Sequence, residues 1–198
     1  IVYYFLQAGY SVFLAEHRGH GRSERRLANM GKVYVESFAQ YVRDLHIFVN
    51  KIVKPYRNEM ILFAHSMGGA IGALYLQRYP GDFQKAILSA PMIQMRVRGL
   101  PYPAAMMVAR ICRCLGFGKA YAAGQHGFSK KPRLERSSCL SEERYSYAHA
   151  RRMANPRCQT NGACYSWVCA AQTASVCLQA SENIRKITIP VLLFAAGR

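Results

Sequence analysis

Acidic side chains are scarce in this sequence. Its 198 residues include 27 Lys plus Arg but only 10 Asp plus Glu, which gives a formal net charge of +17, and just two of the acids are aspartates, Asp44 and Asp82. This excess of positive charge favours anionic partners such as nucleic acid or lipid headgroups, but it does not choose among them. Because 51% of the residues are hydrophobic, the chain can bury a core, which excludes a wholly disordered protein.

Long apolar segments are also lacking. Residues 1–15 carry no charge, but Gln7, Gly9 and Ser11 interrupt them, and the segment is shorter than the roughly 20 residues that a spanning helix needs. No basic segment precedes an apolar stretch, so no signal peptide is visible. The chain begins at Ile1 rather than Met, and we expect its natural start to lie upstream, which leaves export open. We expect a cytoplasmic protein that can contact a membrane peripherally.

Cysteine pairs with metal-binding spacing are missing as well. The chain has seven cysteines, but they do not form two C-x-x-C pairs accompanied by histidines. We therefore predict free thiols in a reducing cytosol, with no metal and no other cofactor. All seven lie in the second half of the chain: Cys112, Cys114, Cys139, Cys158, Cys164, Cys169 and Cys177.

Strands and helices are predicted to alternate. Apolar runs predict four strands, at residues 10–15, 60–64, 86–90 and 189–195, and the run at 60–64 is typical of a strand buried on both faces of a parallel sheet. Strands that are separated by helices predict a parallel sheet with helices on its faces.

Two helices are predicted between these strands. The first covers residues 35–52, begins near a Ser37-x-x-Gln40 capping box, and carries one apolar stripe. The second is a helix of small residues at 69–79. The stripe of the first helix consists of Val35, Phe38, Val42, Leu45, Val49 and Ile52.

The segment before the last strand has a different character. Residues 97–186 are helical in pattern and carry 14 basic and 4 acidic side chains, a net charge of +10. We predict an incomplete core at residues 1–96, a helical cap at 97–186, and a returning core strand at 187–198. Such folds place their sites at the carboxyl edge of the strands, where this insertion would lie.

A serine motif follows the second predicted strand. The sequence Ala64-His65-Ser66-Met67-Gly68-Gly69 is the nucleophile elbow G-x-S-x-G with Ala64 in the first glycine position. The strained turn requires small residues two before and two after the serine, and the backbone N–H of the next residue can face an oxyanion. Ser66 is therefore the candidate nucleophile, Met67 supplies the N–H, and His65 is expected to be structural.

This motif belongs to a wider pattern. Together with His17-Arg18-Gly19-His20-Gly21-Arg22-Ser23 and Ser89-Ala90-Pro91-Met92, it resembles α/β-hydrolases of the monoacylglycerol lipase and bacterial lysophospholipase group. The resemblance implies an α/β-hydrolase fold, with a mostly parallel sheet, helices on both faces and an inserted cap. It also implies a carboxylic ester hydrolase that acts on lysophospholipids or monoacylglycerols through Ser66 and an acyl-enzyme.

The resemblance places the other catalytic groups elsewhere. The catalytic acid and histidine would follow the strand that ends at Gly197-Arg198, and the second oxyanion donor would precede Ile1. We therefore expect truncation at both ends, and a 198-residue fragment that is inactive alone. Turnover that is abolished by Ser66→Ala would contradict this expectation.

Acids and histidines inside the chain give weaker alternatives. After Ser66 the sequence has a single aspartate, Asp82, and two histidines, His126 and His149. Glu142 or Glu143 with His149 would lie outside the expected strand-end loops. His17 and His20 are expected to be turn residues rather than bases.

The cap suggests how a substrate surface is approached. Its basic runs are Arg96-Val97-Arg98, Lys130-Lys131-Pro132-Arg133 and Arg151-Arg152, which form either a solvated surface or a surface that docks on anionic headgroups. Trp167, Met106 and Met107 are candidates for an acyl pocket, with core packing as the alternative for Trp167.

Two other functions stay open. One is a serine hydrolase of the same fold that acts on small esters or peptides. The other is a nucleic-acid-binding module, which is disfavoured because the sequence has no groove-reading helix, zinc finger or RNA-binding signature.

Overall fold

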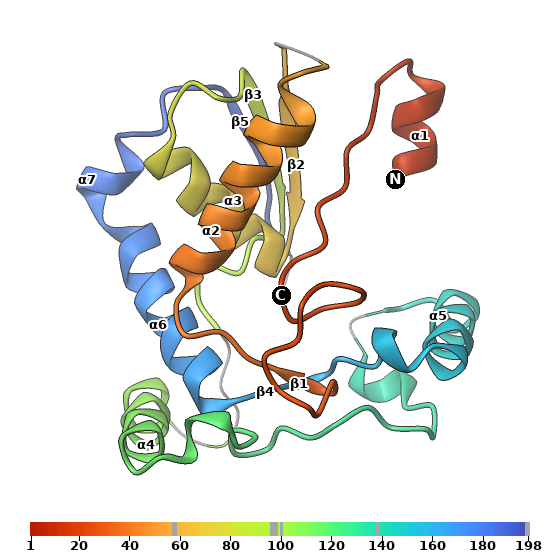
Figure 1. Cartoon of the computed structure of the whole chain (residues 1–198), viewed down its shortest axis with the longest axis vertical. Coiled ribbons are helices and arrows are strands. Elements are labelled where there is room, and N and C mark those ends of the chain that lie inside the picture. Colours follow the sequence, from red (N-terminus) through yellow and green to blue (C-terminus); the bar gives the residue numbers. More distant parts are fainter. Residues whose placement is uncertain (57–58, 96–98, 100, 138, 197–198) are drawn as a thin grey trace.

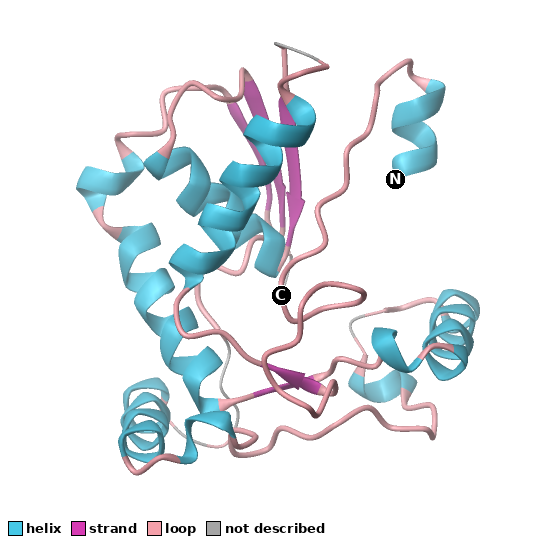
Figure 2. Ribbon diagram, viewed as in Figure 1, coloured by secondary structure: helices cyan, strands magenta, loops and turns pink. Residues whose placement is uncertain are grey.

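Three parallel strands form the central sheet, in the order β2–β3–β5. The computed structural model describes residues 1–56, 59–95, 99, 101–137 and 139–196 (Figures 1 and 2). In it, β2 spans Ile61–His65, β3 spans Lys85–Ser89 and β5 spans Val191–Phe194. Leu62 pairs with Ala86, and Ala86 pairs with Val191. The three strands lie at or within two residues of the positions predicted for them, and the parallel sheet is confirmed.

Helices cover one face of this sheet. α2 (Phe38–Phe48), α3 (Met67–Arg78) and α6 (Tyr165–Gln179) contact one another, and α3 packs on β2 and β3. Their apolar side chains form one core with the inward residues of the strands. Its most buried large side chains include Val35, Tyr41, Val49, Ile71, Tyr75 and Leu76.

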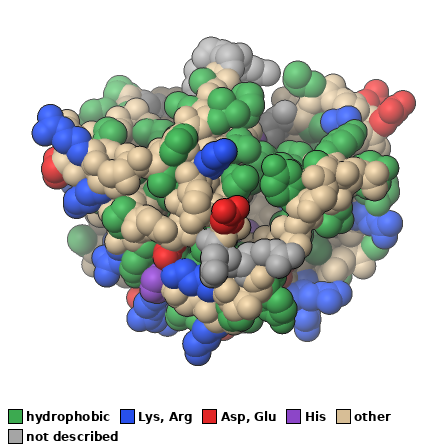
Figure 3. Space-filling model, turned by 90° about the horizontal axis from the view of Figure 1, so that it is seen from above, with side chains coloured by type: hydrophobic (Ala, Val, Ile, Leu, Met, Phe, Trp, Pro, Cys, Tyr) green, Lys and Arg blue, Asp and Glu red, His purple; other side chains and the backbone are tan. Residues whose placement is uncertain are grey.

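The opposite face of the sheet is only partly covered. Ile61 is 46% exposed and Phe63 is 36% exposed, so the prediction that this strand is buried on both faces is wrong. α1 (Val2–Gln7) approaches this face, where the rings of Phe5 and Phe63 lie 5.5 Å apart. Figure 3 shows hydrophobic side chains at the surface between scattered Lys and Arg side chains.

The strand predicted at residues 10–15 does not form. These residues are extended but irregular, and β2 has a single ladder partner, β3, among the residues the structure describes. Phe13 packs against the core, whereas Leu14 is 71% exposed. A β-prone sequence becomes a strand only where a neighbouring backbone accepts its hydrogen bonds, and no such pairing occurs here.

The first predicted helix is confirmed over most of its length. Ser37 caps α2 by accepting a hydrogen bond from the Ala39 N–H at 3.2 Å. The helix continues into a π-helical turn, η1 (Val49–Val53), which shifts the buried stripe by one residue. As a result Val53 is buried, and Ile52, which was predicted to be part of the stripe, is 47% exposed.

The middle of the chain is mostly helical; its helices α4 (Tyr102–Cys114) and α5 (Glu142–Ala154) lie beyond the carboxyl ends of the strands, whereas α6 runs beside α2 and α3 (Figure 1). It also contains α7 (Ser181–Ile184) and the short 3-10 turns η2 (Phe117–Lys119), η3 (Leu134–Arg136) and η4 (Pro156–Cys158). Although α6 falls within the predicted cap, it packs into the core. No helix in the described ranges is long and apolar enough to cross a bilayer.

A short parallel ribbon ties this segment to the first half of the chain. β1 (Lys32–Val33) pairs with β4 (Gly162–Ala163), so residues that are far apart in sequence lie side by side (Figure 2).

Candidate active site

Ser66 stands at a sharp turn between β2 and α3. Its backbone has φ 52° and ψ −121°, a region that residues other than glycine rarely adopt. The Ser66 N–H donates to the Ser89 carbonyl oxygen at 3.0 Å, and the Ser66 carbonyl accepts from the Met92 N–H at 2.9 Å. The end of β3 therefore holds the strained residue in place. The side chain is exposed and makes no capping hydrogen bond to α3.

The glycines after Ser66 differ in what they permit. A Cβ on Gly69 would lie 2.7 Å from Pro91 Cβ and 2.8 Å from Pro91 Cα, so Gly69 allows α3 to pass close to the loop after β3. A Cβ on Gly68 would meet its nearest neighbour, His17 Nε2, at 3.8 Å, an ordinary contact. The small residue that this turn requires is thus Gly69, and the motif's spacing pointed to Gly68 instead.

Ala64 meets the same demand on the strand side. A Cβ on Gly72 of α3 would lie 3.3 Å from Ala64 Cβ and 3.1 Å from Leu62 Cδ2, so α3 and β2 approach closely here. A larger side chain at residue 64 would push the helix away from the sheet. The departure from the usual first glycine of the motif is therefore tolerated.

The backbone N–H of Met67 is the first of α3. First-turn N–H groups have no acceptor within their own helix, and they carry the positive end of the helix dipole. His65 is exposed, and its Nδ1 lies 3.2 Å from Ser89 Oγ on the neighbouring strand. His65 thus contacts β3, in keeping with a structural role.

The glycine-rich loop at residues 16–23 lies beside the turn. The ring of His17 contacts the ring of Tyr41, with centroids 5.6 Å apart, and faces Gly68. Burial lowers the pKa of His17 below 6.5, and the neighbouring His20 lowers it further. Burial also lowers the pKa of His20, so both rings are neutral at pH 7.

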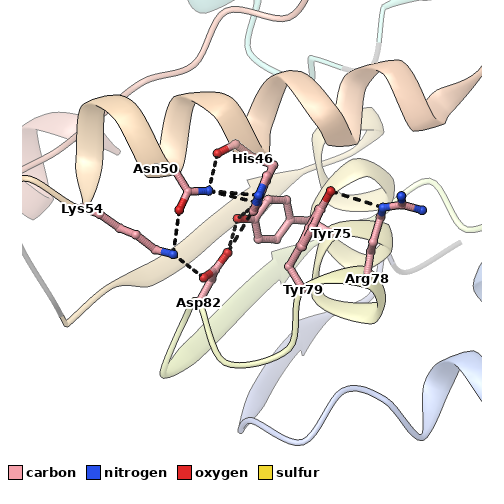
Figure 4. Close-up of polar contacts among 7 residues, drawn as sticks. All are labelled: His46, Asn50, Lys54, Tyr75, Arg78, Tyr79 and Asp82. Carbon is pink, nitrogen blue, oxygen red and sulfur yellow. Dashed lines mark hydrogen bonds and ion pairs between the residues drawn. The ribbon is translucent and has the colours of Figure 1, made fainter.

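Both aspartates of the chain are engaged in ion pairs. Arg18 donates to both carboxylate oxygens of Asp44 on α2, at 2.5 and 2.6 Å, which fixes the loop against the helix. Asp82 accepts from Lys54 at 2.6 Å and from the Tyr75 hydroxyl at 2.5 Å (Figure 4). These contacts give Asp82 a structural role between α2, η1 and α3.

The histidines of the middle segment also have other partners. His149 Nε2 lies 3.1 Å from the Ser129 carbonyl oxygen, and its ring packs against Phe128 and Tyr145. His126 Nδ1 lies 2.7 Å from the Gly127 carbonyl oxygen. Among the residues that the structure describes, it brings neither histidine into a hydrogen bond with Ser66, Glu142 or Glu143.

The three residues predicted to line an acyl pocket lie in different surroundings. Trp167 is buried in the core on α6, with its ring 5.7 Å from that of Phe38. On α4, Met106 is buried and Met107 is 59% exposed. The acyl pocket stays a prediction.

The residues of the predicted basic runs differ in exposure and in their contacts. Lys130, Lys131 and Arg133 are exposed. Arg152 donates to the carbonyl oxygens of Cys158 and Thr160 and lies over the Phe128 ring, so it holds the segment together. The run at residues 96–98 falls outside the described residues.

The seven cysteines are free thiols in this structure, and Cys164 and Cys169 are buried. Burial raises the pKa of both of these thiols. No group of three or more His, Cys, Asp or Glu side chains among the described residues is placed to hold a metal ion.

Comparison with known proteins places this geometry in a family. The family model Hydrolase_4, described as serine aminopeptidase S33, matches residues 1–198. The chain belongs to the Hydrolase_4 family. Lysophospholipase L2 of Escherichia coli (strain K12) is 34% identical to this Hydrolase_4 chain over 170 residues, which cover 85% of the chain and 50% of that protein. Monoglyceride lipase of Rattus norvegicus is 40% identical over 83 residues, which cover 41% of the chain and 26% of that protein.

A solved structure supports the fold of this Hydrolase_4 chain. A soluble variant of monoglyceride lipase from Saccharomyces cerevisiae superposes with a TM-score of 0.58 at 13% identity, covering 92% of this chain and 67% of that one. The α/β-hydrolase fold and the resemblance to the lipase and lysophospholipase group are thereby confirmed. The chain spans about half the length of the Escherichia coli relative.

Proposed function

We propose that this chain carries the nucleophile of a carboxylic ester hydrolase, and that Ser66 is that nucleophile. The observation that carries the proposal is the backbone of Ser66, which is held at φ 52° in an exposed strand-to-helix turn. Strain of this kind costs about 1–3 kcal/mol and persists where function requires it. The turn presents the hydroxyl outward at the carboxyl edge of the sheet.

In the proposed reaction, a general base removes the Ser66 proton while Oγ attacks the acyl carbon of an ester. The carbonyl oxygen gains negative charge, and the Met67 N–H at the start of α3 stabilises it. The alcohol leaves with a proton from the protonated base, and water then hydrolyses the acyl-enzyme in the same way.

The proposed substrates are lysophospholipids or monoacylglycerols. The names of the relatives support this class, since one is a lysophospholipase L2 and the other a monoglyceride lipase. The description of the family model, serine aminopeptidase, makes an aminoacyl substrate the alternative. A panel of lysophospholipids, monoacylglycerols, small esters and aminoacyl amides separates these classes.

Labelling with a fluorophosphonate probe tests the nucleophile. In a protein that also supplies the catalytic acid and histidine, this chain should be labelled, and Ser66→Ala should abolish labelling and lower kcat/KM at least about a thousandfold. Ser89→Ala is a matched control, because Ser89 lies one strand away and contacts His65 through its hydroxyl. Labelling that survives Ser66→Ala would exclude Ser66 as the nucleophile.

We also propose that α4 and the exposed basic residues contact an anionic membrane surface. Met107 and Ile111 on α4 and Leu115, its C-cap residue, follow one another at helical spacing, and their exposed fractions are 59%, 50% and 68%. The exposed Arg110 and Arg113 flank them. An apolar stripe between basic residues is typical of helices that lie in the membrane interface.

Vesicle sedimentation tests this contact. Binding should be stronger on anionic than on neutral vesicles, and Ile111→Asp should weaken it. Equal binding to both kinds of vesicle would contradict the electrostatic part of the proposal, and unchanged binding of Ile111→Asp would contradict the part played by α4.

A further inference from the structure

A cavity lined by arginines lies between the glycine-rich loop and the middle segment of the chain. Its volume is about 180 Å³, and it is lined by Gly21, Arg22, Ser23, Arg25, Met30 and Arg157. Arg157 belongs to η4, so the cavity forms only where two distant parts of the sequence meet.

The positive charge of this cavity is incompletely balanced. None of its three guanidinium groups forms an ion pair with a carboxylate of the described residues. Glu16 is an acid within the loop: it accepts a hydrogen bond from the Arg22 backbone N–H at 2.7 Å and fills the space where a Cβ on Gly21 would lie. The three lining guanidinium groups and the Glu16 carboxylate together carry a net charge of +2.

Arg25 supplies a fixed charge. Its guanidinium donates to the carbonyl oxygens of Gly19, Gly21, Met30 and Arg157, as well as to Thr160 Oγ1 at 2.7 Å. All five acceptors are neutral, and the buried Nε–H has no acceptor. The charge is therefore held at the cavity wall without a counter-ion.

Arg22 and Arg157 supply donors that can move. Both side chains are exposed, so their guanidinium groups stay hydrated in the absence of a ligand. Guanidinium forks match the oxygens of phosphate in pairs, and such charge-assisted hydrogen bonds are the strong ones. A phosphate group is small enough for the cavity, and its charge of about −1 to −2 matches the net charge there.

We propose that this cavity binds a phosphate group. The inference rests on the proposed function for its most direct source, because a lysophospholipid carries a phosphodiester in its headgroup and a monoacylglycerol does not. The glycine-rich loop lies against the Ser66 turn at one end, where His17 faces Gly68, and lines the cavity at the other, through Gly21, Arg22 and Ser23. Phosphate binding would thus favour lysophospholipids as substrates.

Calorimetric titration tests the site without turnover. The full chain carrying Ser66→Ala is titrated with inorganic phosphate, sn-glycero-3-phosphocholine and glycerol in low-salt buffer. We expect both phosphate compounds to bind and glycerol not to bind. Tighter binding of the glycerophosphodiester identifies a lipid headgroup as the source, and tighter binding of inorganic phosphate identifies free phosphate.

Paired variants locate the site. Arg22→Ala with Arg157→Ala should weaken binding of both phosphate compounds about tenfold or more. Lys130→Ala with Lys131→Ala removes the same charge from an exposed surface elsewhere and should change binding less than about twofold. Should circular dichroism reveal that the arginine variant is unfolded, Arg22→Gln with Arg157→Gln replaces it.

Three results would overturn the inference: neither phosphate compound binds, the arginine variant binds as its parent does, or both paired variants weaken binding equally. Ester hydrolysis is measured separately, without the Ser66→Ala substitution, in a protein that also supplies the catalytic acid and histidine. Hydrolysis without phosphate binding overturns this inference alone, and phosphate binding without ester hydrolysis overturns the proposed function alone.

Discussion

At the scale of single residues, the most informative feature is the positive φ of Ser66. Hydrogen bonds from Ser66 to Ser89 and from Met92 to Ser66 hold this backbone in place. Ala90, in the adjacent loop after β3, also has a positive φ, of 42°. Two strained backbones therefore meet at the carboxyl edge of the sheet, and glycine substitution can measure what each strain costs.

Two substitutions of Ser66 distinguish the cost of its backbone conformation from the role of its hydroxyl. Ser66→Gly should raise the free energy of unfolding by about 1 kcal/mol relative to Ser66→Ala, because glycine adopts φ 52° without a Cβ penalty. In a protein that also supplies the catalytic acid and histidine, both variants should lack esterase activity. Chemical denaturation of the two variants side by side provides the measurement, and equal stabilities would mean that the turn is unstrained.

Alanine substitution of the two glycines of the elbow should cost different amounts of stability. Gly69→Ala should destabilise the protein by about 1–3 kcal/mol, because the new methyl group would collide with Pro91. Gly68→Ala meets no close atom and improves helix propensity, so its cost should be below about 0.5 kcal/mol. Thermal unfolding of the two variants compares them, and equal losses would refute the assignment of the close contact to Gly69.

At the scale of helices and strands, the correctly predicted features were those that depend on residues close together in the sequence. The Ser37 cap and the apolar stripe of α2 were predictable because both depend on residues within a few positions of one another. The strand at residues 10–15 was wrongly predicted because pairing requires a partner backbone that the segment itself cannot reveal. The π-helical turn at Val49–Val53 was missed for a related reason, since the periodic pattern alone does not distinguish it from a regular helix.

A polar network joins α2, η1 and α3 through Asp82 (Figure 4). Lys54 and Tyr75 donate to the carboxylate, and His46 stacks on Tyr79 with ring centroids 3.8 Å apart. Asp82→Asn should lower the free energy of unfolding at pH 7 by about 1–3 kcal/mol, because it removes the charge that Lys54 pairs with. Urea unfolding measures the loss. Asp44→Asn serves as a comparison at the other aspartate.

The same variant should alter the dependence of stability on pH. Burial by itself would raise the pKa of Asp82, but hydrogen bonds from Lys54 and Tyr75 outweigh it and lower the pKa below 3.8. The carboxylate therefore stabilises the fold above about pH 4, and this contribution is lost as the pH falls through the lowered pKa. The difference between the parent and Asp82→Asn should shrink in that range. A difference that stays constant down to pH 2 would contradict it.

At the scale of the whole molecule, Arg25 connects the two halves of the chain. It donates to residues of its own loop and to Arg157 and Thr160, more than 130 residues later. The sequence marks this arginine no differently from its neighbour Arg26, whose side chain is exposed and pairs with Glu36. Such a contact was not predictable, because its acceptors are mostly backbone carbonyls that any sequence could supply.

Hydrogen exchange can compare these two neighbours. Arg25→Met should speed amide exchange at Asn161 and Cys164, which bond to Gly31 and Val33, by about tenfold to a hundredfold. Amides of β3 should exchange at the rate of the parent. Arg26→Met should have little effect, because exposed ion pairs contribute at most about 1 kcal/mol. Equal effects of the two substitutions would show that Arg25 does not hold the halves together.

The ribbon of β1 and β4 also has a consequence for how the protein is made. Lys32 pairs with Gly162, 130 residues later in the chain. At about 5–20 residues per second, a ribosome needs roughly 6–26 s to synthesise that interval. Throughout that time β1 has no partner strand, and Arg25 lacks two of its acceptors, the Arg157 carbonyl oxygen and Thr160 Oγ1. We therefore expect the surroundings of the nucleophile to be completed late in synthesis, after β2, α3 and β3 have already emerged.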